Sequence, residues 1–180
     1  MKHLVFDKNK TEPFELSRTG IDEFLRCPRS FVLKWKYVVP PPGVPPLTLA
    51  LATDHWLKNE FDRVRREGSS DHWIFRKFGL DVVPYQHDEL DAWRSNFKGI
   101  RYFHEPTNMV VYGAIDDIWK DINSGELYLV DYKSTSKKEN PDIESGWGLH
   151  YKKQMKIYQW LFKQNGYELS NIEFSIYQWD

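Results

Sequence analysis

Apolar and polar residues in the first third of the chain follow a helical spacing. Ser17 suits the N-cap of a helix that runs to about Leu25. Pro28 either interrupts this helix or starts a second one that continues through Trp35. The proline-rich stretch over residues 40–46 then predicts a stiff, extended connector between two elements.

After this connector the pattern predicts a long helix from Leu47 to about Arg66, followed by one or two helices between Asp71 and Glu105. From Met109 the pattern changes to the alternation that is typical of strands. The expected elements are strands over 109–112, 114–120 and 126–133, a turn over 123–125, a helix over 147–163 and a strand over 172–179. Helices around a central hairpin, closed by one more strand, indicate an α/β or α+β domain.

Composition narrows the class of protein. A chain of 180 residues with 41% hydrophobic and 28% charged residues fits one globular domain. The net charge of −1 gives no global basic signal for nucleic acid, so any phosphate binding must come from local patches or a metal ion. The start of the chain has no apolar signal run, and no segment has the length of a membrane span, which predicts a cytoplasmic protein without membrane contact.

The candidate chemistry lies at the end of the strand over residues 126–133. Asp131 and Lys133 are two positions apart, so their side chains share one face of this strand. Leu127 and Leu129 precede them on that face, where the apolar pattern becomes charged. Ends of strands are places where a sheet protein can position reactive groups without disturbing its core.

Asp116 and Asp117 lie on the preceding strand, and the parity of the hairpin decides which of them faces Asp131. A loop of two residues, Asn123 and Ser124, places Asp116 opposite Asp131. A loop that also includes Gly125 places Asp117 there instead. Spacing alone leaves both arrangements open.

Two carboxylates that converge at a strand end repel each other unless a cation lies between them. Oxygen ligands beside an amine suit Mg²⁺ or Mn²⁺, and such an ion activates a water molecule and stabilises phosphoryl charge. A surface salt bridge between Asp131 and Lys133 is the simpler explanation of the triplet taken alone.

The triplet is one of several motifs that follow one another in order. Gly113–Asp116, Val130–Ser134 and Gln154–Tyr158 resemble the G-x-x-D, D-Y-K-[TS] and Q-x-x-x-Y motifs of PD-(D/E)XK nucleases. The branch that they resemble is the RecB type, which includes CRISPR-associated exonucleases. Upstream, Ser17–Tyr37 looks like the N-terminal helical segment of that branch, and His55 looks like the histidine of its first motif.

The resemblance implies a role for each matching residue. His55, Asp116 and Asp131 would bind Mg²⁺ or Mn²⁺, with the backbone carbonyl of Tyr132 as a further ligand, and Lys133 would be the catalytic lysine. It selects Asp116 over Asp117, which then becomes an outward-facing or supporting residue. Gln154 and Tyr158 would shape the active site. Lysines that could contact DNA phosphates are Lys137, Lys138, Lys152 and Lys156, although a solvated helix face explains the last two equally well.

The resemblance also implies a restriction-endonuclease-like core, in which helices flank a central mixed sheet. One domain over residues 1–180 would comprise an N-terminal helical segment and connector over 17–46 and a catalytic core over 47–180. Some relatives bind an iron–sulfur cluster through four cysteines, the first of which matches Cys27. No cluster is expected here, because Cys27 is the one cysteine of the sequence, unless the sequence is part of a longer protein.

The expected function is metal-dependent hydrolysis of DNA phosphodiester bonds, in repair, recombination or defence, with a helicase or repair complex as a candidate partner. A nucleic-acid-binding module that has the same fold but no catalytic activity is the alternative.

Overall fold

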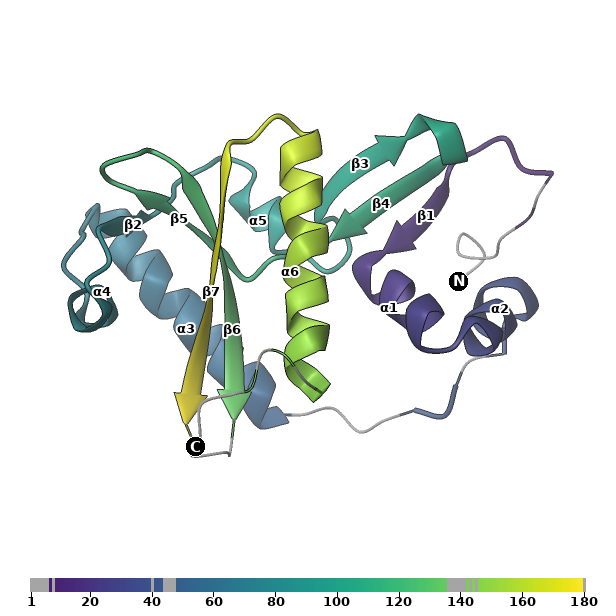
Figure 1. Cartoon of the computed structure of the whole chain (residues 1–180), viewed down its shortest axis with the longest axis horizontal. Helices are drawn as coiled ribbons and strands as arrows, with labels where there is room; N and C mark the ends of the chain where they lie inside the picture. Colours follow the sequence, from purple (N-terminus) through teal and green to yellow (C-terminus); the bar gives the residue numbers. More distant parts are fainter. Residues whose placement is uncertain are drawn as a thin grey trace.

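The computed structural model describes residues 7, 9–39, 41–43, 48–135, 142, 144 and 146–179. Its strands form two mixed sheets, and helices flank them, as Figure 1 shows. The expected mixed α+β class with a restriction-endonuclease-like arrangement is confirmed. Between residues 113 and 117, where one strand ends and the next begins, the chain passes from one sheet to the other.

The N-terminal part contains strand β1 (Phe14–Ser17) and helices α1 (Arg18–Arg26) and α2 (Pro28–Tyr37). Ser17 caps α1 as expected, because its Oγ accepts a hydrogen bond from the Gly20 amide at 3.0 Å. Pro28 is the first residue of α2, where the missing amide proton costs nothing, so it starts a second helix rather than interrupting one.

The smaller sheet has the strand order β1-β4-β3 and contains β3 (Ile100–His104) and β4 (Met109–Gly113). A short 3-10 turn, η2 (Glu105–Thr107), connects these two antiparallel strands. Strand β1 pairs in parallel with β4. The sequence pattern did not reveal β1, because a strand of 4 residues is too short to show its period.

The larger sheet has the order β2-β5-β6-β7. Its strands are β2 (Val82–Pro84), β5 (Asp117–Asp121), β6 (Leu127–Thr135) and β7 (Leu169–Trp179). Strands β5 and β6 form the expected antiparallel hairpin, and β7 runs parallel to β6. The parallel pair requires a crossover connection, and helix α6 lies within it.

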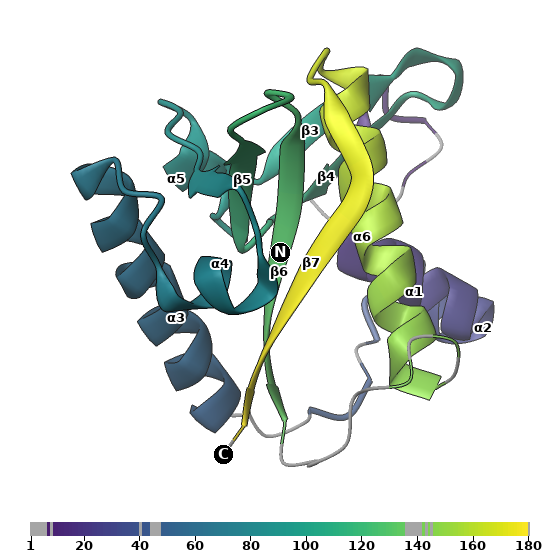
Figure 2. The same ribbon diagram turned by 60° about the vertical axis from the view of Figure 1, so that its left-hand side comes forward.

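Two long helices cover the larger sheet. Helix α3 (Thr48–Glu67) and helix α6 (Gly146–Gln164) lie on opposite sides of β6 and β7, as Figure 2 shows. Alternate residues of β6 point to these two sides. Leu127 and Leu129 pack in a cluster with residues of α6, whereas Val130 and Tyr132 pack in a cluster with residues of α3. Both faces of this strand are therefore buried up to the point where Asp131 lies.

The expectation of only helices between residues 71 and 105 is wrong in part. Short helices α4 (Trp73–Phe78) and α5 (Leu90–Trp93) lie there, together with strands β2 and β3. Strand β2 has 3 residues and pairs with β5, more than thirty residues away, so local periodicity could not show it. Strand β3 forms a hairpin with β4, and its 5 residues lie within the stretch for which the pattern predicted only helices. In the part of the chain that the structure describes, no helix has the length and apolar character needed to cross a membrane.

Candidate active site

The register of the β5–β6 hairpin places Asp116 beside Asp131. Asp117 pairs with Val130, and extending this register by one residue sets Asp116 opposite Asp131. This is the parity of the two-residue loop, one of the two arrangements that the sequence left open. Asp116 lies between Gly113, where β4 ends, and Asp117, where β5 begins, so it lies where the chain passes from one sheet to the other.

Asp131 is a buried carboxylate with an exposed fraction of 2%. Its Oδ1 accepts hydrogen bonds from Nζ of Lys133 at 2.5 Å and from Nε2 of Gln154 at 2.9 Å. Its Oδ2 is buried and has no hydrogen-bond partner among the described residues. Burial raises the pKa of Asp131 to about 7, with a further rise from Asp116, although Lys133 opposes the shift. A buried carboxylate oxygen without a hydrogen-bond donor is a position that a bound cation can satisfy.

Both oxygens of Asp116 have partners. The amide of Tyr132 donates to Oδ2 at 2.9 Å, which ties this carboxylate to β6. Nζ of Lys58 lies 3.2 Å from Oδ1 and also 2.9 Å from Oδ2 of Asp54, one turn earlier on α3. Burial lowers the pKa of Lys58, but the attraction of Asp116 and Asp54 outweighs burial and raises it overall. Lys58 is therefore a cation held between two carboxylates.

Asp54 and Asp116 line a polar cavity of about 260 Å³. Its lining comes from α1, α3, α6, the end of β4 and the centre of β6. The residues that line it include Arg18, Asp54, Asn96, Gly113, Asp116, Tyr132, Lys133, Gln154 and Tyr158. Nζ of Lys133 lies 5.0 Å from the centre of the Tyr151 ring, and its side chain is 17% exposed. The predicted residues Asp116, Lys133, Gln154 and Tyr158 thus line one cavity, and Asp131 is bonded to two of them, Lys133 and Gln154.

The glycine of the first motif has a steric function. A Cβ atom on Gly113 would lie 2.6 Å from Cε1 of Tyr158 and 3.3 Å from Cβ of Arg18. Only a residue without a side chain lets the Tyr158 ring approach β4 this closely. The Arg18 guanidinium lies 5.9 Å from the centre of that ring, and burial raises the pKa of Tyr158 to about 12 against the opposing charge of Arg18.

A family model for the PD-(D/E)XK nuclease superfamily matches residues 45–178. The chain belongs to this superfamily. The match covers the two long helices, the larger sheet and the whole cavity except its α1 side. No curated protein and no solved structure matches the chain.

The histidine expected from the resemblance is not in the cavity of this PD-(D/E)XK chain. His55 is on the exposed side of α3, where its Nε2 lies 3.0 Å from Nδ2 of Asn59, and the described residues that line the cavity include Asp54 but not His55. Successive residues of a helix point about 100° apart, so one position decides which of them faces the site. Asp54 therefore lies where a ligand from this helix is expected.

Asp117 is neither outward-facing nor part of the cavity. It is 0% exposed and accepts hydrogen bonds from the Tyr132 hydroxyl at 2.7 Å and from the backbone amide of Ile118. It also forms ion pairs with Arg65 and, at 2.7 Å, with Arg94. This buried network joins α3, the loop after α5 and the hairpin behind the cavity, so Asp117 supports the position of Asp116.

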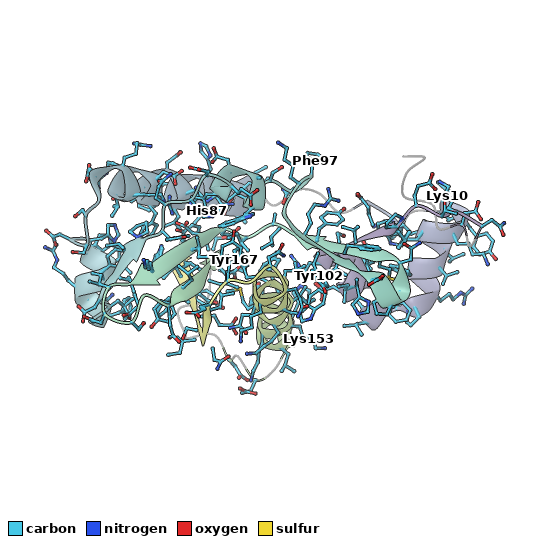
Figure 3. All side chains as sticks on the ribbon, turned by 90° about the horizontal axis from the view of Figure 1, so that it is seen from above. Lys10, His87, Phe97, Tyr102, Lys153 and Tyr167 are labelled. Carbon is cyan, nitrogen blue, oxygen red and sulfur yellow. The ribbon has the colours of Figure 1, made fainter. Side chains whose placement is uncertain are left out.

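The expected phosphate-binding lysines fall into two groups. Lys152 and Lys156 are exposed on α6, on the side away from Gln154, and they bond to Glu144 and Gln159 respectively. Figure 3 shows their neighbour Lys153 projecting from the outer surface of this helix. Neither Lys152 nor Lys156 is among the described residues that line the cavity. Lys137 and Lys138 lie outside the described residues.

Residues that sequence reasoning missed are Asp54, Lys58 and Arg18. The signal for the first two was available, because Asp54 and Lys58 are four residues apart and so share a face of the helix. The same spacing is common on solvated helix faces, so it did not single them out. Arg18 reaches the cavity only because β1 pairs with β4, which the sequence did not show.

The donor set fits a divalent cation of the type that these nucleases use. Asp116 and Asp131 present carboxylates, and Oδ2 of Asp131 is buried without a hydrogen-bond partner among the described residues. Hard oxygen donors are those that Mg²⁺ and Mn²⁺ prefer. The described residues contain no group of three or more His, Cys, Asp or Glu side chains that could hold a metal by themselves. Two carboxylates, backbone carbonyls and water are the usual donors for Mg²⁺, which keeps several waters.

Proposed function

We propose that this chain hydrolyses phosphodiester bonds of DNA in a reaction that requires Mg²⁺ or Mn²⁺. The observation that carries the proposal is the buried Asp131, which lies against Asp116, holds Lys133 at 2.5 Å and leaves its Oδ2 without a hydrogen bond. A purely structural aspartate would be expected to satisfy both oxygens when it is 2% exposed. Membership of the PD-(D/E)XK nuclease superfamily agrees with this chemistry.

The residues that would hold the cation are Asp116, Asp131 and the backbone carbonyl of Tyr132, with Asp54 as a further candidate in place of His55. When bound there, a divalent cation lowers the pKa of a water molecule and neutralises charge on the phosphoryl oxygens.

Lys133 is the residue that would act on the attacking water. Its ammonium faces the cavity while Asp131 and the Tyr151 ring restrict its position. It can orient that water, accept or relay its proton, and offset the negative charge that develops on the phosphate. Gln154 keeps Asp131 oriented through its bond to Oδ1, so it acts on Lys133 through Asp131.

Arg18 is the cationic side chain that would contact the substrate phosphate from the opposite wall. It is near Tyr158 and bonds to Asp22 at 2.7 Å, which leaves further guanidinium donors for an anion. These local charges supply the phosphate binding that a net charge of −1 does not.

The order of the three motifs along the chain supports a finer assignment within the superfamily. We place the chain in the RecB-type branch, with a role in repair, recombination or defence and a helicase or repair complex as the candidate partner.

The test is cleavage of labelled linear, circular, single-stranded and double-stranded DNA with Mg²⁺ and with Mn²⁺. Lys133→Ala and Asp131→Ala are expected to lose cleavage by at least about a hundredfold, the scale of a positioned acid–base or electrostatic group. Circular dichroism and thermal melting should show that both variants remain folded. Lys153→Ala, on the outer side of α6, is the matched control and should cleave as the wild type does.

Full cleavage by either active-site variant would refute the proposal. Wild-type protein that binds DNA but cleaves none of these substrates with either metal would instead identify a non-catalytic binding module.

A further inference from the structure

The loop between α5 and β3, residues 94–99, carries the most exposed large apolar side chain in the described part of the chain. Phe97 is 92% exposed, and Figure 3 shows it at the edge of the molecule, away from the core. Exposed apolar residues are common at single positions and need no explanation by themselves. Phe97, however, lies next in the chain to a residue that lines the cavity.

The tip of this loop adjoins the cavity. Asn96, the residue before Phe97, lines the cavity together with Asp116 and Lys133. Lys98, the residue after Phe97, is exposed. Phe97 is thus an exposed aromatic ring that directly follows a residue of the cavity lining and directly precedes an exposed cation.

The loop is also tied to the segment that carries Asp116. The Gly99 amide donates to the Ala92 carbonyl at 3.0 Å, and the Ile115 amide donates to the Trp93 carbonyl at 3.1 Å. Gly99 has a φ of +62°, and a Cβ atom there would lie 2.4 Å from the Gly113 carbonyl oxygen. Glycine is required at this position for both reasons. These contacts fix the loop over residues 94–99 relative to the segment that carries Asp116.

An exposed ring beside a phosphate-binding cavity is the arrangement with which proteins hold single-stranded nucleic acid. Each base has an apolar face that stacks on an aromatic side chain whatever its identity, while neighbouring cations contact the backbone. A base inside a duplex already stacks on its neighbours and cannot offer its face to a protein ring. An aromatic platform thus favours strands that are unpaired or frayed.

We propose that Phe97 stacks on an unpaired base of the substrate, next to the nucleotide whose phosphate lies at Asp116 and Asp131, and that Lys98 contacts the adjoining backbone. This proposal rests on the proposed function, because it assigns the nucleotide that flanks that phosphate. It identifies single-stranded DNA, or a frayed end, as the substrate form that the cavity accepts.

The test is equilibrium binding of a fluorescent single-stranded oligothymidylate, followed by anisotropy in EDTA so that no cleavage takes place. Phe97→Ala is expected to weaken binding about tenfold, within the range that loss of one stacked base produces. Phe97→Trp should bind at least as tightly as the wild type, because it keeps the aromatic face. Phe78→Ala is the matched control, since Phe78 is 62% exposed at the end of α4 and has no place in the cavity lining.

Two further ligands separate stacking from a general loss of affinity. An abasic oligomer of the same length should bind wild type and Phe97→Ala equally, and a blunt duplex should show no more than about a twofold difference. Equal binding of oligothymidylate by wild type and Phe97→Ala would overturn the proposal, as would an equal loss for the abasic oligomer. If the wild type cleaves DNA and Phe97→Ala behaves like it, only this inference fails. If the wild type neither binds nor cleaves DNA, the proposed function fails with it.

Discussion

Nζ of Lys58 lies 3.2 Å from Oδ1 of Asp116, so a protein cation already occupies one side of the carboxylate that is expected to bind a metal ion. The same ammonium pairs with Asp54 at 2.9 Å. A divalent cation that binds Asp116 through Oδ1 would have to share this oxygen with Lys58 or displace it. Lys58 offsets part of the negative charge of Asp54 and Asp116, and we expect it to compete with a metal ion for both carboxylates.

Lys58→Met should bind Mn²⁺ more tightly than the wild type, by about tenfold, because a unit charge at this distance contributes about 1 kcal/mol or more in partly solvated surroundings. Isothermal titration calorimetry at low ionic strength measures this affinity directly. Lys153→Met on the outer face of α6 is the control for removing one positive charge. Weaker Mn²⁺ binding by Lys58→Met than by this control would show that Lys58 does not compete with the metal.

Asp54 and His55 are adjacent on α3, but their side chains point in different directions. Substitutions at the two positions should therefore differ in their effect on Mn²⁺ affinity. Asp54→Asn is expected to weaken Mn²⁺ binding severalfold, because Asp54 lines the cavity and its Oδ1 is buried without a partner among the described residues. His55→Asn should leave affinity and cleavage within about twofold of the wild type, as surface substitutions usually do. The reverse ranking in calorimetry would restore His55 as the ligand.

Asp116 and Asp117 should show opposite effects on activity and stability. Asp117→Asn leaves Arg65 and Arg94 with Asp62 as the carboxylate that they share, so two buried cations lose one of their two counter-charges. Breaking a buried ion pair costs about 3–5 kcal/mol of unfolding free energy. Asp116→Asn should keep most of the stability and lose cleavage.

Urea denaturation gives the free energies for both variants. Asp71→Asn, in an exposed pair with Arg76, is the control for losing a surface ion pair and should cost less than about 1 kcal/mol. A loss of stability from Asp117→Asn no larger than that of the control would contradict the supporting role of Asp117.

Gly113→Ala should distort the cavity. The added methyl group would lie 2.6 Å from the Tyr158 ring, so the ring or β4 must move, and overpacking of this kind costs about 1–3 kcal/mol. Gly43→Ala meets no atom within 4 Å and serves as the control. Thermal melting should show a lower midpoint for Gly113→Ala alone, together with weaker cleavage. An unchanged midpoint would mean that the Tyr158 ring moves aside without cost to stability, which would contradict the steric role of Gly113.

We expect the protein to lose stability in mild acid because His72 is buried. Burial lowers the pKa of His72, against the opposing effect of Glu60, and its Nδ1 accepts a hydrogen bond from the Ile74 amide at the start of α4. A depressed histidine pKa means that the folded state disfavours the proton. The stability from neutral His72 is present above the unfolded pKa of about 6.5 and is lost as the pH falls through the folded pKa.

Melting midpoints measured from about pH 7.5 to about pH 5 should therefore fall more for the wild type than for His72→Gln, which has no titrating ring. Parallel curves for the two proteins would contradict this assignment.

The sequence by itself determined the class of the fold, the long helices, the central hairpin and the pairing of Asp131 with Lys133. Each follows from a local rule, namely helical spacing over α3 and α6 and alternation along β6. The ordered motifs also indicated the superfamily, which the family match shows. Short elements such as β1 and β2 were missed because strands of 4 and 3 residues carry too little pattern.

Only the tertiary structure decided which neighbouring residues face the cavity. One position along a helix or a strand redirects a side chain, so Asp54 replaced His55 and the register of the hairpin selected Asp116, while Asp117 turned into the core. Contacts across long stretches of sequence, such as Lys58 with Asp116 and Gly99 with Gly113, leave no periodic trace in the chain. They form when the sheets and helices pack, and they brought Lys58 to the acidic pair and the Phe97 loop to the rim of the cavity.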